Sequence, residues 1–92
     1  MEYIRIIQPP KSKVMKSGRV ILKPGEDVGE HITEKREEII IVLKGKATIK
    51  KSGKDFVVEQ GNTFYIEEGI THNIFNKTEF VLEYIFVVSL FE

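Results

Sequence analysis

The side chains that could carry chemistry in this sequence are few. The chain has two histidines, His31 and His72, and no cysteine. The lack of cysteine excludes a disulfide framework, a thiolate zinc site, an iron–sulfur cluster and a cysteine nucleophile. His31 stands six residues after Gly25, and His72 stands three residues after Gly69. Each histidine therefore follows a glycine of the kind that marks a turn.

The spacing of the residues near the histidines can be interpreted in terms of strands. If His31 and Thr33 lie on a strand, their side chains share a face, because they are two residues apart. Glu38 opens the next apolar segment, seven residues after His31. The same period of two puts Glu38, Ile40 and Val42 on one face of that segment.

The elements that must position these side chains are predicted to be short strands. The chain has 13 Ile, 9 Val and 5 Thr but a single Ala, a composition rich in strand formers. No window keeps a 3.6-residue period. Apolar segments bounded by turn signals, the pattern of an antiparallel sandwich or barrel, occur at residues 3–7, 19–23, 39–43, 47–51, 55–59, 63–66, 72–76 and 80–91.

Two longer stretches carry a resemblance to a known family. Residues 25–45 read GEDVGEHITEKREEIIIVLKG, and residues 61–76 read GNTFYIEEGITHNIFN. They resemble the paired motifs of the cupin superfamily, in particular those of its small single-domain members. The resemblance implies an all-β fold, a double-stranded β-helix or jelly-roll barrel of antiparallel strands. It also implies that residues 1–92 form one barrel domain.

The resemblance further implies a metal site. In cupins the first motif supplies two histidines and a glutamate, and the second supplies a third histidine, around a divalent metal inside the barrel. His31, Glu38 and His72 match three of these four positions, whereas Thr33 occupies the position of the second histidine. The divalent metal expected at this site is iron, manganese, zinc or nickel. Glu67 stands where a proline usually precedes Gly69, which is expected to change only the stiffness of a turn.

Thr33 leaves two hypotheses open, because a hydroxyl is a poor ligand for a divalent transition ion. In the first, the two imidazoles and the carboxylate hold the metal, and Thr33 hydrogen-bonds a metal-bound water. In the second, the metal has been lost and the histidines line a pocket. Besides Thr33, the residues predicted to surround the metal or the substrate are Ile40, Val42, Tyr65 and Ile74.

These hypotheses predict different functions. A metal-binding cupin would hold a small metabolite in the barrel and act as an isomerase, a lyase or a dioxygenase. A metal-free cupin would bind a small ligand, or sense one, without catalysis. A third alternative is a structural interaction domain, in which Ile40, Val42 and Ile74 would fill the barrel and leave no cavity.

Charge and hydropathy limit the partners. With 14 basic and 14 acidic residues the formal net charge is zero, so bulk electrostatics gives no reason to bind nucleic acid or a membrane. The longest apolar run, residues 39–43, is far shorter than a membrane span. No signal-peptide pattern begins the sequence, so a cytoplasmic location is expected. The excess of Ile, Lys and Glu is similar to a thermophile composition.

A homodimer is expected. The segment at 39–43 is apolar on both faces, so its outer face needs a cover: the N-terminal strand, the C-terminal strand or another copy of the chain. Small cupins commonly pair through an outer sheet. Residues 3–7 and 85–91 offer further apolar faces for such pairing.

Overall fold

The computed structural model describes residues 1–91, and these form nine strands. Every strand expected from the sequence is present. The second begins four residues earlier than expected, and the two-residue β3 is additional because so short a segment has no detectable period. The strands are β1 (Glu2–Ile7), β2 (Met15–Leu22), β3 (His31–Ile32), β4 (Arg36–Lys44), β5 (Lys46–Lys51), β6 (Lys54–Glu59), β7 (Thr63–Ile66), β8 (Thr71–Phe75) and β9 (Leu82–Leu90).

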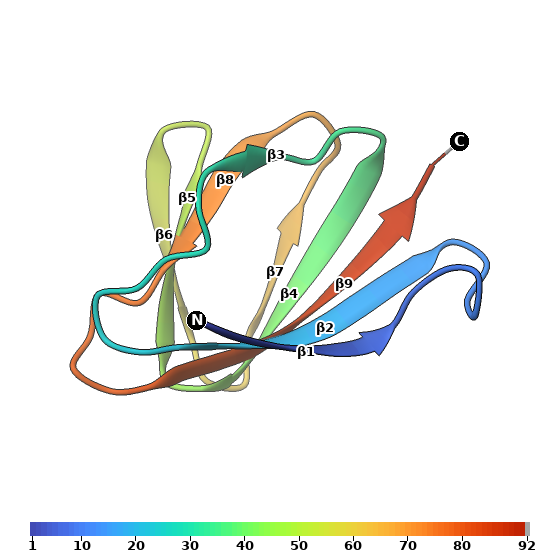
Figure 1. The fold of residues 1–92 in the computed structure, drawn as a ribbon. Coiled ribbons are helices and arrows are strands. Elements are labelled where there is room, and N and C mark those ends of the chain that lie inside the picture. The colour runs from blue at the N-terminus through green and yellow to red at the C-terminus, as the bar shows by residue number, and fades with distance from the viewer. Residues whose placement is uncertain (92) are drawn as a thin grey trace.

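The strands form two sheets that face each other (Figure 1). The larger sheet has the order β1-β2-β9-β4-β7, and the smaller has the order β3-β8-β5-β6. All of the pairings between these strands are antiparallel. The expectation of an all-β, antiparallel jelly-roll barrel is confirmed. No helix in the described residues is long and apolar enough to cross a membrane.

The hydrophobic core fills the space between the sheets. The alternation of β4 buries Ile40 and Val42 completely, and Ile49 of β5 and Ile74 of β8 meet them from the smaller sheet. Burial of each such side chain contributes roughly 1.5–3 kcal/mol. This core fixes the facing surfaces of the two sheets, and with them the positions of polar side chains on the same faces.

One turn of the first motif depends on glycine. Gly45 connects β4 to β5 with a φ of 85°, in the left-handed region. A Cβ atom there would also lie 2.6 Å from the carbonyl oxygen of Val81. Both the backbone conformation and the close approach therefore require glycine at this position.

The outer face of β4 is not covered by either terminal strand. β9 pairs directly with β4, and β1 lies in the same sheet beyond β2, so both lie beside β4 rather than over it. Ile39 and Leu43 remain 37% and 40% exposed. The expectation that a terminal strand covers this face is therefore wrong, because both terminal strands are hydrogen-bonded into the same sheet as β4. Another copy of the chain is the expected cover that is left.

Candidate metal centre

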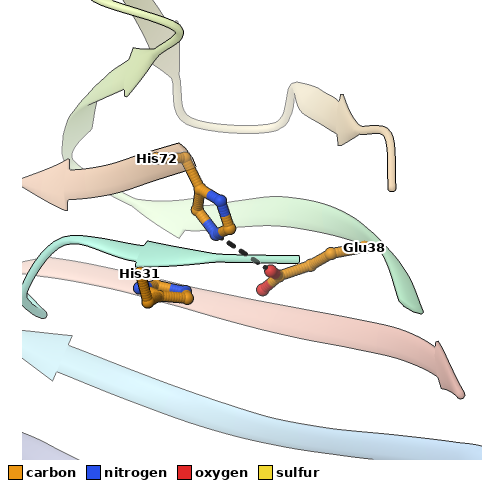
Figure 2. Close-up of side chains that lie close together, drawn as sticks. All are labelled: His31, Glu38 and His72. Carbon is orange, nitrogen blue, oxygen red and sulfur yellow. Dashed lines mark ion pairs between the residues drawn. The ribbon is translucent and has the colours of Figure 1, made fainter. Parts of the chain in front are cut away.

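The two histidines and Glu38 meet between the sheets. His31 of β3 is paired in register with His72 of β8, and their rings lie 4.0 Å apart between centroids. Glu38 faces them from β4 in the opposite sheet, as Figure 2 shows. One ligand atom from each residue lies within 4.8 Å of the other two. Three groups far apart in the sequence are thus close enough for a single ion to bridge them.

Each histidine ring is anchored at Nδ1 by a backbone carbonyl. Nδ1 of His31 lies 2.9 Å from the carbonyl oxygen of Gly29, and Nδ1 of His72 lies 3.0 Å from that of Ile70. A carbonyl can only accept, so each Nδ1 carries the proton. In the neutral rings Nε2 then carries the lone pair, which is the form of imidazole that binds a metal.

Nε2 of His72 is buried, and within residues 1–91 it has no hydrogen-bond partner. The residue is 1% exposed, and Nε2 lies 3.4 Å from Oε1 of Glu38, which is itself 8% exposed. Burial disfavours the charged imidazole, but the Glu38 carboxylate and the Ile70 carbonyl outweigh that effect and raise the pKa of His72. A buried polar atom without a partner is costly. A divalent cation bound to both groups would satisfy it, so these residues fit a metal.

Thr33 has a structural role beside the cluster. Its side chain is buried, and its hydroxyl donates to the carbonyl of Glu67 at 2.6 Å and accepts from the backbone N–H of Ile70 at 3.1 Å. The single hydroxyl proton is therefore used by the loop before β8. The hydrogen bond from Thr33 to a metal-bound water stays a prediction, and in it the hydroxyl would have to accept rather than donate.

A cavity of about 240 Å³ adjoins the cluster. It lies mainly along the inner face of the larger sheet and is partly open to solvent. Two of its lining residues, Thr33 and Ile74, were expected around the site. The full lining is Met1, Tyr3, Lys16, Val20, Val28, His31, Thr33, Arg36, Glu38, Ile74, Tyr84, Phe86 and Val88.

Three residues that were assigned to the pocket lie outside this cavity. Ile40 and Val42 share the face of Glu38, as expected, but they are fully buried in the core below it. Tyr65 is on the outer face, 51% exposed, and donates a hydrogen bond to Glu37. The expectation for Tyr65 is wrong because it pairs with Ile39, whose side chain points outward.

The sequence reasoning missed three polar residues of the cavity. Tyr84 of β9 is buried, and burial together with the charge of Glu38 raises its pKa. The sequence carried a signal for Tyr84, because a period of two places it on the same face of the last strand as Leu82, Phe86 and Val88. Lys16 lies in the part of β2 that was not predicted, and Arg36 lies before residue 39, where the strand was expected to begin.

Comparison with known proteins agrees with this description. A family model for the cupin domain matches residues 18–88. No curated protein sequence matches the chain. Among solved structures, a predicted oxalate decarboxylase from Thermotoga maritima is similar, with a TM-score of 0.88 and 28% sequence identity. The match covers 96% of this chain and 78% of the decarboxylase chain.

Two further structures are similar. A recombinant oxalate oxidase in complex with glycolate has a TM-score of 0.76 and 26% sequence identity. The match covers 83% of this chain and 42% of the oxidase chain. The cupin domain of Schizosaccharomyces pombe Cnp3 has a TM-score of 0.87 at 12% identity, a likeness of fold alone. That match covers 96% of this chain, which spans 63% of the Cnp3 chain. With the family model matching most of its residues, the chain belongs to the cupin superfamily.

Proposed function

We propose that this cupin holds a divalent metal ion on His31, Glu38 and His72 and binds a small metabolite in the adjoining cavity. The observation that carries the proposal is the buried Nε2 of His72, which faces the Glu38 carboxylate and has no hydrogen-bond partner in the described part of the chain. The matching Nδ1 contacts of the two histidines support it, because both rings are oriented with Nε2 available.

The bound ion would supply Lewis-acid chemistry or dioxygen activation, which correspond to an isomerase, a lyase or a dioxygenase. Two histidines and a carboxylate form a known ligand set for iron(II) and, with water, for zinc. This chain's own residues would orient the ligand against the ion and limit the entry of water. The solved structures named for oxalate and glycolate support a small substrate, since molecules of two carbon atoms are small enough for the cavity.

The test is metal analysis of protein purified without a histidine tag, followed by titration with iron(II), manganese, zinc and nickel. We expect bound metal and a rise in melting temperature with at least one ion. His72→Ala and Glu38→Gln should each abolish that rise. Glu37→Gln is the matched control, because the neighbouring Glu37 hydrogen-bonds Tyr65 on the outer face. Protein that carries no metal and responds to none of the ions would contradict the proposal.

The second candidate is a metal-free cupin that binds or senses a small ligand. It is favoured by Thr33, whose hydroxyl stands at the position of a fourth ligand and is used in the loop before β8. Thr33→His separates the two candidates. If Thr33→His binds metal tightly and the unsubstituted protein does not, the metal-free candidate is favoured. Equal metal content in the variant and the unsubstituted protein favours the metal site. The third alternative, an interaction domain with a filled barrel, is disfavoured by the cavity.

A further inference from the structure

Two cationic side chains line the cavity and have no part in the metal cluster. Lys16 of β2 and Arg36 of β4 both reach it from the larger sheet. Lys16 pairs with Val88 from one side of β9, and Glu38 pairs with the same residue from the other side. Arg36 is two residues from Glu38 on the same face and pairs with Leu90. The two cations therefore flank β9 at one end of the cavity.

The charges of these two residues are not matched by the surrounding protein. Within residues 1–91 neither Lys16 nor Arg36 forms an ion pair. Arg36 donates through Nε to the carbonyl of Glu34 at 3.3 Å, a contact that leaves the other guanidinium N–H groups available. Glu38 is the one carboxylate among the lining residues, and it faces His72. This end of the cavity is thus electropositive, even before a metal cation is counted.

The wall between the charged groups is apolar. Val88 lies between Lys16 and Glu38, and Phe86 and Val20 continue the same inner surface. An inorganic anion offers nothing to such a wall, whereas a short hydrocarbon chain would cover it. The cavity of about 240 Å³ holds roughly eight waters' share of liquid volume, which is room for a molecule of a few carbon atoms.

We infer that the ligand of this cavity is a small organic carboxylate whose charged end is bound by Lys16 and Arg36. A guanidinium can hold a carboxylate through two parallel hydrogen bonds, and the lysine adds a point charge from across β9. The inference deepens the proposed function and rests on it, since the cluster of His31, Glu38 and His72 is taken as the place of the ligand's other end. Lys16 and Arg36 would then select for charge, and the apolar wall for a short chain.

Calorimetric titration with malonate tests the inference, and malonamide serves as its neutral isostere. Both chelator-treated and metal-loaded protein are titrated. We expect malonate to bind at least about tenfold more tightly than malonamide, because charge-assisted hydrogen bonds are lost with the amide. Lys16→Gln and Arg36→Gln should each weaken malonate binding about tenfold or more. Lys50→Gln, an exposed lysine on the outer face of β5, is the matched control and should leave binding unchanged.

The outcomes separate this inference from the proposed metal site. Malonate binding that depends on Lys16 and Arg36 in a protein that takes up no metal would support the inference and contradict the metal proposal. Malonate binding to the metal-loaded protein that neither substitution weakens would overturn the inference and leave the metal proposal intact. Equal affinity for malonate and malonamide, or tighter binding of inorganic phosphate than of malonate, would also overturn it. The comparison of the two isosteres in the unsubstituted protein needs no variant to fold, and Arg36→Lys, expected to be intermediate, provides a milder second substitution.

Discussion

Thr33 and His72 share one hydrogen-bond acceptor. The carbonyl oxygen of Ile70 lies 3.2 Å from the backbone nitrogen of Thr33 and 3.0 Å from Nδ1 of His72. The Thr33 hydroxyl holds the same loop through Glu67 and through the N–H of Ile70. Thr33, which stands where the family resemblance implies a histidine, therefore supports the backbone that orients His72.

Thr33→Val should destabilise the protein and disturb the cluster. The valine keeps the shape but leaves the part-buried N–H of Ile70 and the carbonyl of Glu67 without their hydroxyl partner. We expect a loss of about 1–3 kcal/mol in the free energy of unfolding, measured by denaturant titration. Thr33→Ser retains the hydroxyl and should lose less than about 1 kcal/mol. Equal losses in the two variants would show that the hydroxyl contributes nothing.

Gly18 makes room for the aromatic wall of the cavity. A Cβ atom there would lie 2.8 Å from Cε2 of Phe86 and 3.0 Å from Cε2 of Tyr3, two rings that stack on each other. Gly18→Ala should therefore lower the free energy of unfolding by about 1 kcal/mol, since overpacking exceeds the gain from removing a strand glycine. Adding Phe86→Leu to this variant should restore part of the loss, which a double-mutant cycle measures. Additive effects of the two substitutions would contradict the contact.

Tyr84 should make the fold sensitive to alkali. Burial, and then the charge of Glu38, raises the pKa of its phenol in the folded state. A raised folded pKa contributes stability that is complete below the unfolded pKa, about 10, and is lost as the pH rises above it toward the folded pKa. Tyr84→Phe should therefore lose less stability than the parent between about pH 9 and pH 11 in denaturant titrations. Tyr3→Phe, at a tyrosine that is 45% exposed, is the control. An unchanged alkaline profile for Tyr84→Phe would contradict the assignment.

The uncovered outer face of β4 leads us to propose a homodimer through the larger sheet. Ile39 and Ile41 of β4 pair in register with Val87 and Ile85 of β9, so their outward side chains form a continuous apolar surface. Ile39→Lys should shift the mass measured by light scattering from two chains to one. Val57→Lys, at an exposed valine on the smaller sheet, is the matched control and should leave the mass unchanged. A one-chain mass for the unsubstituted protein across dilution would contradict the dimer.

Local patterns in the sequence were sufficient to locate eight of the nine strands and the two motifs. The alternation that places Glu38, Ile40 and Val42 on one face depends only on the pleat of a strand, and turn residues such as Gly45 carry their own conformational requirement. These signals act over a few residues, so they can be found without knowledge of the partners. The expectation of His31, Glu38 and His72 as neighbours came from the family resemblance, and the structure brings them together.

The remaining features depend on register between strands distant in the sequence, and only the tertiary structure decided them. Tyr65 lies outside because it pairs with Ile39, and Lys16 reaches the cavity because β2 pairs with β9 opposite Val88. The role of Thr33 likewise depends on contacts with a loop more than 30 residues away. The sequence by itself determined which residues alternate and where the chain turns, because those are local properties of the backbone. The pairing of whole strands in three dimensions determines which face of each strand meets the cavity. It also determines which cationic side chains lie beside the cluster of His31, Glu38 and His72.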